Sequence, residues 1–209
     1  MIKEFINTSY LEAKFARAFV FLSPNTWTTL SLVAALAAYL AVSHSRPVLG
    51  VALFAVSGLL DIIDGMVARF SGRVSRLGAF WDGVVDRFVD ALLILCFFSL
   101  SFPVRAETLH MLLFALLFAT LLPPFIVAYA NHRGAVPDPS EKEIWRFAFR
   151  IEYLIIYLLV ILLNPLSSTA SYILLWTGMA LMWATVIQSI VLVFIKSKKY
   201  GSTTSAGES

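Results

Sequence analysis

Residues 48–70 read VLGVALFAVSGLLDIIDGMVARF, an apolar run long enough to cross a lipid bilayer, yet Asp61 and Asp64 lie inside it. A membrane-spanning helix needs about 20 mostly apolar residues, and an ionised carboxylate within it costs at least about 2.5 kcal/mol on insertion scales. A second apolar run, residues 79–101, contains three further carboxylates: Asp82, Asp86 and Asp90. Carboxylates at such a cost indicate a functional site in a membrane-embedded helical protein.

The composition also indicates a membrane protein. Of the 209 residues, 59% are hydrophobic and 14% are charged, whereas soluble domains have roughly 45–50% and about 25%. A water-soluble globule of this length cannot bury so much apolar surface. The single cysteine, Cys96, excludes a disulfide framework and a zinc site built from cysteines. We expect no cleavable signal peptide at the charged N-terminus and no nucleic-acid partner.

Six apolar segments are predicted to span the membrane, so the expected fold class is an all-α, polytopic membrane protein. They are residues 27–44, 48–70, 79–101, 108–130, 150–164 and 170–195. Residues 1–21 form an amphipathic segment with two open interpretations: a helix in the membrane interface, or a helix packed against the ends of the bundle. We expect one domain over residues 1–200, with the bundle at 22–199 and a disordered polar tail at 201–209.

The positive charges are distributed unevenly between the two ends of the expected bundle. With six spans both termini lie on one side, and 13 of the 16 Lys and Arg residues fall on that side. The other side has only Arg46 and Arg105, while Arg87 lies within the third span. Because cytoplasmic loops are enriched in Lys and Arg, this asymmetry predicts that both termini are cytoplasmic in an integral protein of the cell membrane.

The spacing of the acidic residues predicts that they converge. Positions three and four apart share one helix face, so Asp64 lies within about 60° of Asp61. The aspartates of the third span are four residues apart and form a second stripe. Residues 71–77 are too few for anything but an antiparallel hairpin. We therefore expect Asp61 and Asp64 to face Asp82 and Asp86 across one cavity near the cytoplasmic surface.

Several carboxylates in one cavity repel one another unless cations lie between them. Mg²⁺ and Mn²⁺ take oxygen ligands and commonly bind substrate phosphates as well, and paired metal ions suit displacement at phosphorus. We therefore expect two divalent ions, Mg²⁺ or Mn²⁺. The alternative is a set of intramembrane ion pairs with Arg69, Arg73 and Arg87, which is less favoured because the five acids outnumber the nearby bases.

A longer pattern, D-x2-D-G-x2-A-R-x8-G-x3-D-x3-D, runs from Asp61 to Asp86 with every fixed position matched. It resembles the signature of the CDP-alcohol phosphotransferase (CDP-alcohol phosphatidyltransferase) family, and within it the phosphatidylinositol and archaetidylinositol phosphate synthases. The sequence Pro24-Asn25-x-x-Thr28 also resembles the start of the first span in that family.

The resemblance covers residues 20–95 well and implies a function. Such proteins are integral membrane, phospholipid-synthesising transferases with six membrane helices, a divalent metal requirement and commonly a homodimeric assembly. They move a phosphatidyl-type group from a CDP-linked lipid to the hydroxyl of a polar acceptor and release CMP. The implied partners are a CDP-activated lipid donor, a small polar acceptor, membrane lipids and a second copy of the chain.

The resemblance also implies roles for single residues. Metal binding is expected from Asp61, Asp64 and Asp82, while Asp86 either completes the metal site or, as the candidate catalytic residue, takes the acceptor proton. CDP binding is expected from Asn25, Thr28, Asp61, Gly65, Ala68, Arg69, Gly78 and Asp82. The role of Asp90, one turn beyond the signature, stays open between the acceptor or metal site and a pairing with Arg87 or another helix.

Basic residues between the fourth and fifth spans are candidates for binding the acceptor. The candidates are Arg133, Arg146 and Arg150, with Asp90 in addition. A basic pocket suits an acceptor that has its own phosphate, such as inositol phosphate or glycerol 3-phosphate, and serine ranks lower. The alternative is cytoplasmic charge in contact with anionic lipid head groups. The sequence identifies neither the acceptor nor the donor lipid.

A divalent metal cation transporter or channel is the alternative function that uses the same intramembrane carboxylates. Transport favours acidic residues spread over several helices and across the bilayer. Here they gather on one hairpin, and the first, fourth and sixth spans contain none. The sequence therefore favours the transferase.

Overall fold

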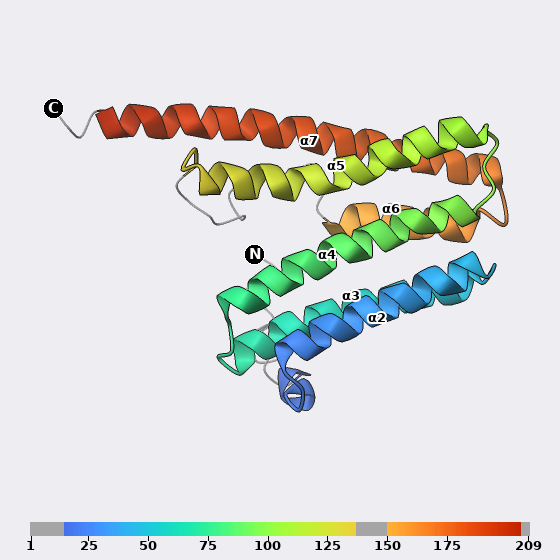
Figure 1. Cartoon of the computed structure of the whole chain (residues 1–209), viewed down its shortest axis with the longest axis horizontal. Coiled ribbons are helices and arrows are strands. Elements are labelled where there is room, and N and C mark those ends of the chain that lie inside the picture. The colour runs from blue at the N-terminus through green and yellow to red at the C-terminus, as the bar shows by residue number, and fades with distance from the viewer. Residues whose placement is uncertain (1–14, 137–149, 206–209) are drawn as a thin grey trace, which may run out of the picture. The chain divides into compact units, whose positions relative to one another are not determined.

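The computed structural model describes residues 15–136 and 150–205, with the backbone alone for residues 199–205. Regular structure in these residues is helical. The helices with defined bounds are α2 (Pro24–Ser43), α3 (Pro47–Phe70), α4 (Arg76–Cys96), the 3-10 turn η1 (Phe97–Ser99), α5 (Ala106–His132), α6 (Arg150–Leu163) and α7 (Ser168–Ser205). The chain forms two compact units, Met1–Ser99 and Leu100–Ser209 (Figure 1).

Local sequence sets where the first helices begin. Ser23 caps α2 by accepting a hydrogen bond from an amide of the first turn, and Pro24 occupies that turn, where no amide hydrogen is needed. Pro47 occupies the same place at the start of α3. Ser75 caps α4, because its Oγ accepts from the Gly78 amide at 3.0 Å.

A short turn connects α3 to α4, as the sequence predicts. The Ser71 amide donates to the Val67 carbonyl at 2.9 Å, which completes the last turn of α3. Gly72 then adopts a φ of +65°, a left-handed conformation that glycine takes without strain at the end of a helix. This turn reverses the chain, so the acidic stripes of the two helices are brought together at one end of the hairpin.

In the first unit, α2 packs against both α3 and α4 (Figure 1). At one end of the α2–α3 pair, a Cβ atom added to Gly50 would lie only 3.1 Å from the Ala38 carbonyl oxygen. Small residues permit such close approach between membrane helices. Further along, Ser57 of α3 donates to the carbonyl oxygen of Ser31 on α2 at 2.8 Å. These contacts fix the register of α2 on α3.

The second unit contains α5, α6 and α7, and α7 packs against both other helices. Gly178 of α7 lies against the buried ring of Tyr157 on α6. Asn164, which follows α6, fastens the segment before α5: its Nδ2 donates to the Ser101 carbonyl at 2.8 Å, and its Oδ1 accepts from the Ser101 amide at 3.3 Å. This end of the unit is therefore held by side-chain hydrogen bonds to backbone.

The six predicted spans correspond to six helices, and they differ mainly at their ends. The third predicted span, residues 79–101, corresponds to α4, which ends at Cys96 and is followed by the 3-10 turn η1. Within the described residues, α2, α3, α5 and α7 are long and apolar enough to cross a membrane. Helix α4 has too many charged residues to be counted with these four, and α6 has 14 residues in the described part of the chain. These apolar helices are consistent with an integral membrane protein, while six spans stay a prediction.

Two expectations about the termini have different outcomes. A disordered tail from residue 201 is wrong for residues 201–205, because α7 continues to Ser205; an established helix adds each further residue at little cost. Residues 206–209 lie outside the described residues. At the other terminus residues 15–19 are helical, and residues 1–14 of the predicted amphipathic helix lie outside the described part. The interpretation of that helix and the single-domain prediction stay predictions.

Candidate functional site

Three aspartates from two helices converge in the first unit. Asp61 and Asp64 come from α3 and Asp82 from α4, and one carboxylate oxygen of each lies within 4.8 Å of those of the other two. Asp64 is only 6% exposed, and the other two are half-buried. They meet because residues three apart share a helix face and because the turn after α3 folds α4 back along it.

Helix α2 holds the buried carboxylate of this group. Thr28 Oγ1 donates to Asp64 Oδ2 at 2.6 Å, and Thr28 is itself buried. The same hydroxyl lies 3.1 Å from the Pro24 carbonyl oxygen, one turn earlier on α2. A hydrogen bond to an ionised oxygen is shorter and stronger than a neutral one. The 2.6 Å distance therefore favours the carboxylate as the acceptor.

The donor set of this carboxylate group fits a divalent cation. Mg²⁺ binds carboxylate oxygens at about 2.0–2.1 Å, so oxygens on opposite sides of one ion lie about 4.2 Å apart. The spacing of up to 4.8 Å between the three carboxylates is close to that requirement. Without a cation the three charges repel one another in a half-buried site. Asp61, Asp64 and Asp82 are therefore suited to hold a hard divalent metal.

Asp86 and Asp90 continue the acidic stripe along α4, beyond this group of three. Asp86 Oδ2 lies 3.6 Å from Arg87 Nη2, and Asp90 Oδ2 lies 3.1 Å from Arg87 Nη1. Asp90 is 1% exposed, which does not suit contact with a water-soluble acceptor. Of the roles left open for Asp90, the structure contains the pairing with Arg87. Metal binding by Asp86 stays a prediction.

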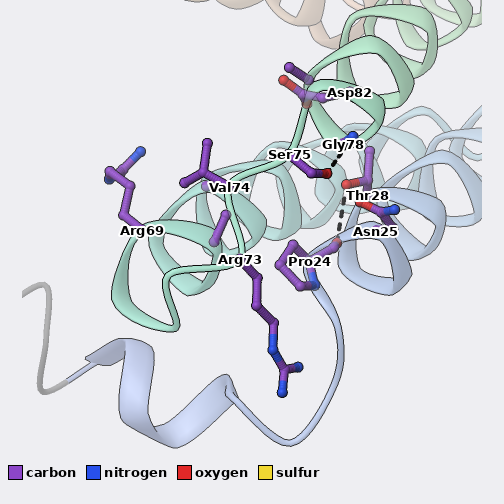
Figure 2. Close-up of a pocket in the computed structure, with 12 residues that line it drawn as sticks. Pro24, Asn25, Thr28, Arg69, Arg73, Val74, Ser75, Gly78 and Asp82 are labelled. Carbon is purple, nitrogen blue, oxygen red and sulfur yellow. Dashed lines mark hydrogen bonds between the residues drawn. The ribbon is translucent and has the colours of Figure 1, made fainter.

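A pocket of about 190 Å³ lies beside the carboxylates, lined by residues of α2, α3, α4 and the α3–α4 turn (Figure 2). Seven of the eight residues expected to bind CDP line this pocket: Asn25, Thr28, Gly65, Ala68, Arg69, Gly78 and Asp82. The eighth, Asp61, belongs to the carboxylate group. The pocket therefore adjoins the carboxylates through Asp82, which belongs to both.

Glycine keeps part of this pocket open. A Cβ atom at Gly78 would lie 3.0 Å from Ser75 Oγ and 3.2 Å from Asn25 Oδ1, both in the pocket wall. Arg69 and Arg73 also line the pocket, and Figure 2 shows their side chains leaving the backbone in different directions, with that of Arg73 extending away from Gly78 and Asp82. The pocket thus combines space near the carboxylates with positive charge, as an anionic ligand requires.

Five lining residues were not among the candidates from the sequence: Pro24, Arg73, Val74, Ser75 and Ala79. Ser75 had a usable signal, because a serine before an apolar helical segment is a common N-cap. The fixed gap of eight residues in the pattern also places the α3–α4 turn near both acidic stripes. Ala79 is one of the short residues beside the acidic stripe of the third span, whereas no feature of the sequence singles out Val74.

The candidates for the acceptor, Asp90 excepted, belong to the second half of the chain. Arg133 follows α5; its Nε donates to the Tyr129 hydroxyl at 3.0 Å, and its guanidinium lies 5.2 Å from the centre of that ring. Arg150 is the first described residue of α6 and is half-buried. Arg146 lies outside the described residues. Acceptor binding by these arginines stays a prediction.

Known proteins are similar to this chain over most of its length. A family model described as CDP-alcohol phosphatidyltransferase matches residues 21–191. The archaetidylinositol phosphate synthase of Aeropyrum pernix is 34% identical over 176 residues, which are 81% of this chain and 82% of that protein. The archaetidylinositol phosphate synthase of Pyrococcus horikoshii is 31% identical over 147 residues, or 70% and 72% of the two chains.

Solved structures agree with this relationship. The crystal structure of the Mycobacterium tuberculosis phosphatidylinositol phosphate synthase in complex with manganese and citrate has a TM-score of 0.72 and 25% identity, and covers 88% of both chains. The same protein with CDP-DAG bound has a TM-score of 0.70 and covers 90% of this chain and 94% of its own. The chain therefore belongs to the CDP-alcohol phosphatidyltransferase family and is a transferase of that type.

Proposed function

We propose that the protein moves a phosphatidyl-type group from a CDP-linked lipid to the hydroxyl of inositol phosphate and releases CMP at the cytoplasmic side of the membrane. The observation that carries the proposal is the convergence of Asp61, Asp64 and Asp82 beside a pocket lined by residues expected to bind CDP. The names of the relatives, archaetidylinositol and phosphatidylinositol phosphate synthases, support the acceptor. None of the comparisons supports a cation transporter.

In this proposal the carboxylates hold two divalent ions, Mg²⁺ or Mn²⁺. Asp61, Asp64 and Asp82 form the common ligand set, and Asp86 completes it from the next turn of α4. When bound, these ions supply positive charge that neutralises the donor diphosphate and stabilises charge at the transferred phosphorus. Manganese in the crystal structure of the mycobacterial relative supports a divalent metal here.

The pocket residues bind and orient the donor. Gly65, Ala68 and Gly78 leave room for the cytidine and ribose, while the guanidinium of Arg69 binds phosphate oxygens through paired N–H groups. Phosphoryl transfer depends chiefly on positioning and on charge stabilisation. A pocket that fixes the nucleotide beside the carboxylates therefore does most of what the reaction needs.

The acceptor hydroxyl attacks the phosphorus that bears the lipid. Asp86 takes the hydroxyl proton on a carboxylate oxygen while the new P–O bond forms, and the bond from that phosphorus to the CMP oxygen breaks. CMP leaves with the electron pair of that bond.

The phosphate of the acceptor requires a cationic partner, which we assign to Arg133, Arg146 and Arg150. Arginine binds phosphate through two parallel hydrogen bonds, and free inositol has no group that needs such a partner. The stacking of Arg133 on Tyr129 gives that guanidinium a defined orientation. The chain would therefore discriminate inositol phosphate from inositol by charge.

The test is CMP release by the purified protein in lipid nanodiscs with Mg²⁺. CDP-archaeol and CDP-diacylglycerol are compared as donors, and inositol 1-phosphate, inositol, glycerol 3-phosphate and serine are supplied separately as acceptors. We expect release with inositol 1-phosphate and none with the other three. Release with glycerol 3-phosphate alone would contradict the acceptor, and no release with any pair would contradict the reaction.

Metal dependence is tested in the same assay. Asp61→Asn and Asp82→Asn preserve side-chain shape but remove a charge, so CMP release should fall by about 10²-fold or more. Glu107→Gln removes an exposed carboxylate from the first turn of α5 and serves as the matched control. EDTA should stop the reaction, and Mg²⁺ or Mn²⁺ should restore it. Wild-type activity in either aspartate variant would contradict the metal assignment.

A further inference from the structure

The hydroxyl of Thr28 lies between the pocket and the buried carboxylate of Asp64. Thr28 lines the pocket, and its Oγ1 donates to Asp64 Oδ2 at 2.6 Å. We propose that Thr28 is a positioning residue, which holds the Asp64 carboxylate in the orientation that joins it to Asp61 and Asp82. The inference rests on the proposed function, because it assigns the carboxylate group to a divalent metal.

A threonine hydroxyl has one proton and donates it to one acceptor at a time. Two acceptors lie near it: Asp64 Oδ2 at 2.6 Å and the Pro24 carbonyl oxygen at 3.1 Å. Hydrogen bonds from a hydroxyl to a carboxylate have lengths of about 2.5–2.7 Å. The Thr28 hydroxyl therefore donates its hydrogen bond to Asp64 Oδ2 rather than to the Pro24 carbonyl oxygen. No proton is left to donate to a nucleotide oxygen, which separates this role from direct binding of CDP.

The backbone that carries Thr28 is itself held in place by α3. Ser57 of α3 donates to the Ser31 carbonyl at 2.8 Å, and Ser31 Oγ donates to the Thr28 carbonyl at 2.7 Å. Each of these residues is buried, with 3% exposure or less. A β-branched side chain also has few rotamers in a helix. The Thr28 hydroxyl therefore contacts the Asp64 carboxylate from a fixed position. Asp64 lies two turns along α3 from Ser57.

Partners that hydrogen-bond to metal ligands orient those ligands, and losing one commonly costs 10–100-fold in metal affinity or activity. Asp64 is the most buried carboxylate of the group, so water is poorly placed to replace the threonine hydroxyl. We therefore expect Thr28 to affect the affinity for the metal directly. Its effect on kcat should follow from that change in metal binding.

The experiment compares Thr28→Val, which keeps the shape and removes the hydroxyl, with Thr28→Ser, which keeps the hydroxyl. Mn²⁺ binding is measured on purified protein without substrates by electron paramagnetic resonance, and kcat and KM for the CDP-lipid follow. Thr28→Val should raise the Kd for Mn²⁺ by about 10–100-fold and lower kcat, with an unchanged KM for the donor at saturating Mn²⁺. Thr28→Ser should restore most of the Mn²⁺ affinity.

Two control variants separate this role from helix packing. Thr185→Val removes an equally buried hydroxyl, which donates to the Leu181 carbonyl within α7 at 2.9 Å, and should leave Mn²⁺ binding unchanged. Ser31→Ala removes a neighbouring buried hydroxyl, whose hydrogen bond to the Thr28 carbonyl lies within α2, without touching Asp64. If Thr28→Val does not yield folded protein, Thr28→Ala replaces it, since it also removes the hydroxyl.

Several outcomes overturn the inference. Wild-type Mn²⁺ affinity in Thr28→Val, with a raised KM for the CDP-lipid, would make Thr28 a nucleotide contact. An equal loss of affinity in Ser31→Ala would assign the effect to packing. If the wild-type protein binds Mn²⁺ but releases no CMP, the proposed function fails while the Mn²⁺ titrations still decide the role of Thr28. If the wild type does not bind Mn²⁺, both proposals fail.

Discussion

Gly78 and Gly83 lie on the same helix, five residues apart, and have opposite surroundings. A Cβ atom at Gly78 would lie 3.0 Å from Ser75 Oγ, which is held by its hydrogen bond to the Gly78 amide, and 3.2 Å from Asn25 Oδ1. A Cβ atom at Gly83 would meet no atom within 4 Å. Of these two glycines, therefore, only Gly78 lies where an added side chain would crowd the pocket wall.

This contrast predicts different effects of two alanine substitutions. Gly78→Ala should raise the KM for the CDP-lipid, because the added methyl group displaces Ser75 or Asn25 in the pocket wall. Gly83→Ala should leave KM unchanged and stabilise the protein by up to about 1 kcal/mol, the helix-propensity difference between the two residues. Steady-state CMP release and thermal denaturation measure both quantities. Equal KM values in the two variants would contradict the assigned role of Gly78.

At the residue scale, periodicity alone predicted most of the carboxylate group. Asp61 and Asp64 share a face because they are three residues apart, and a short turn was enough to bring Asp82 to them. The bond from Thr28 to Asp64 could not be predicted in this way, because it depends on the register of α2 against α3. That register is set by close packing at Gly50 and by the Ser57 contact.

At the scale of the element, α4 is unusual because it has charged residues along an otherwise apolar helix. Arg87 Nη1 lies 3.1 Å from Asp90 Oδ2, and Asp90 is 1% exposed. Removing one partner of a buried pair leaves an uncompensated charge and is strongly destabilising, whereas replacing both by apolar residues is often neutral. The pair therefore makes a buried acid tolerable on the inner face of α4.

We expect Arg87→Met to destabilise the protein by up to about 3 kcal/mol, the lower end of the range for buried pairs, because Asp90 is buried but the Arg87 side chain is 28% exposed. The double variant Arg87→Met/Asp90→Leu should recover most of that loss, because no buried charge then needs a partner. Thermal denaturation of the purified variants in one detergent measures the effect. Equal melting temperatures for the single and double variants would show that Asp90 does not depend on Arg87.

The positions of the helices were predicted from hydropathy more accurately than their ends. Each predicted span overlaps one helix, because apolar runs separated by polar turns leave little choice. The ends depend on capping, such as Ser23 and Ser75, and on the change to a 3-10 turn after Cys96. The continuation of α7 beyond residue 200 was not predictable from a small, polar sequence.

At the scale of the whole molecule, the sequence predicts more than the structure tests. The carboxylates and the pocket belong to the first unit, whereas Arg133 and Arg150 belong to the second. The family match runs from residue 21 to residue 191 and so includes parts of both units. Pairing into homodimers and the assembly of an acceptor site stay predictions, because they depend on contacts that no single helix determines.

The number of membrane crossings is a property of the whole chain, and α4 and α6 decide it. If both cross, the turn at Val74 lies in the cytoplasm, and Glu107 and Leu166 lie on the opposite side. If α4 does not cross, Glu107 lies on the same side as Val74; if α6 does not cross, Glu107 and Leu166 lie on opposite sides. All three residues are exposed at the ends of helices or in turns, so Glu107 compared with Val74 reports on α4, and Leu166 compared with Glu107 reports on α6.

We expect six crossings with cytoplasmic termini, because 13 of the 16 basic residues then lie on the cytoplasmic side. Val74→Cys, Glu107→Cys and Leu166→Cys are made singly in a Cys96→Ser background and treated with a membrane-impermeant maleimide. Glu107→Cys and Leu166→Cys should be labelled in intact cells, and Val74→Cys only after permeabilisation. Protection of Glu107→Cys in intact cells would exclude α4 as a span, and would require its charged face to lie at the membrane surface.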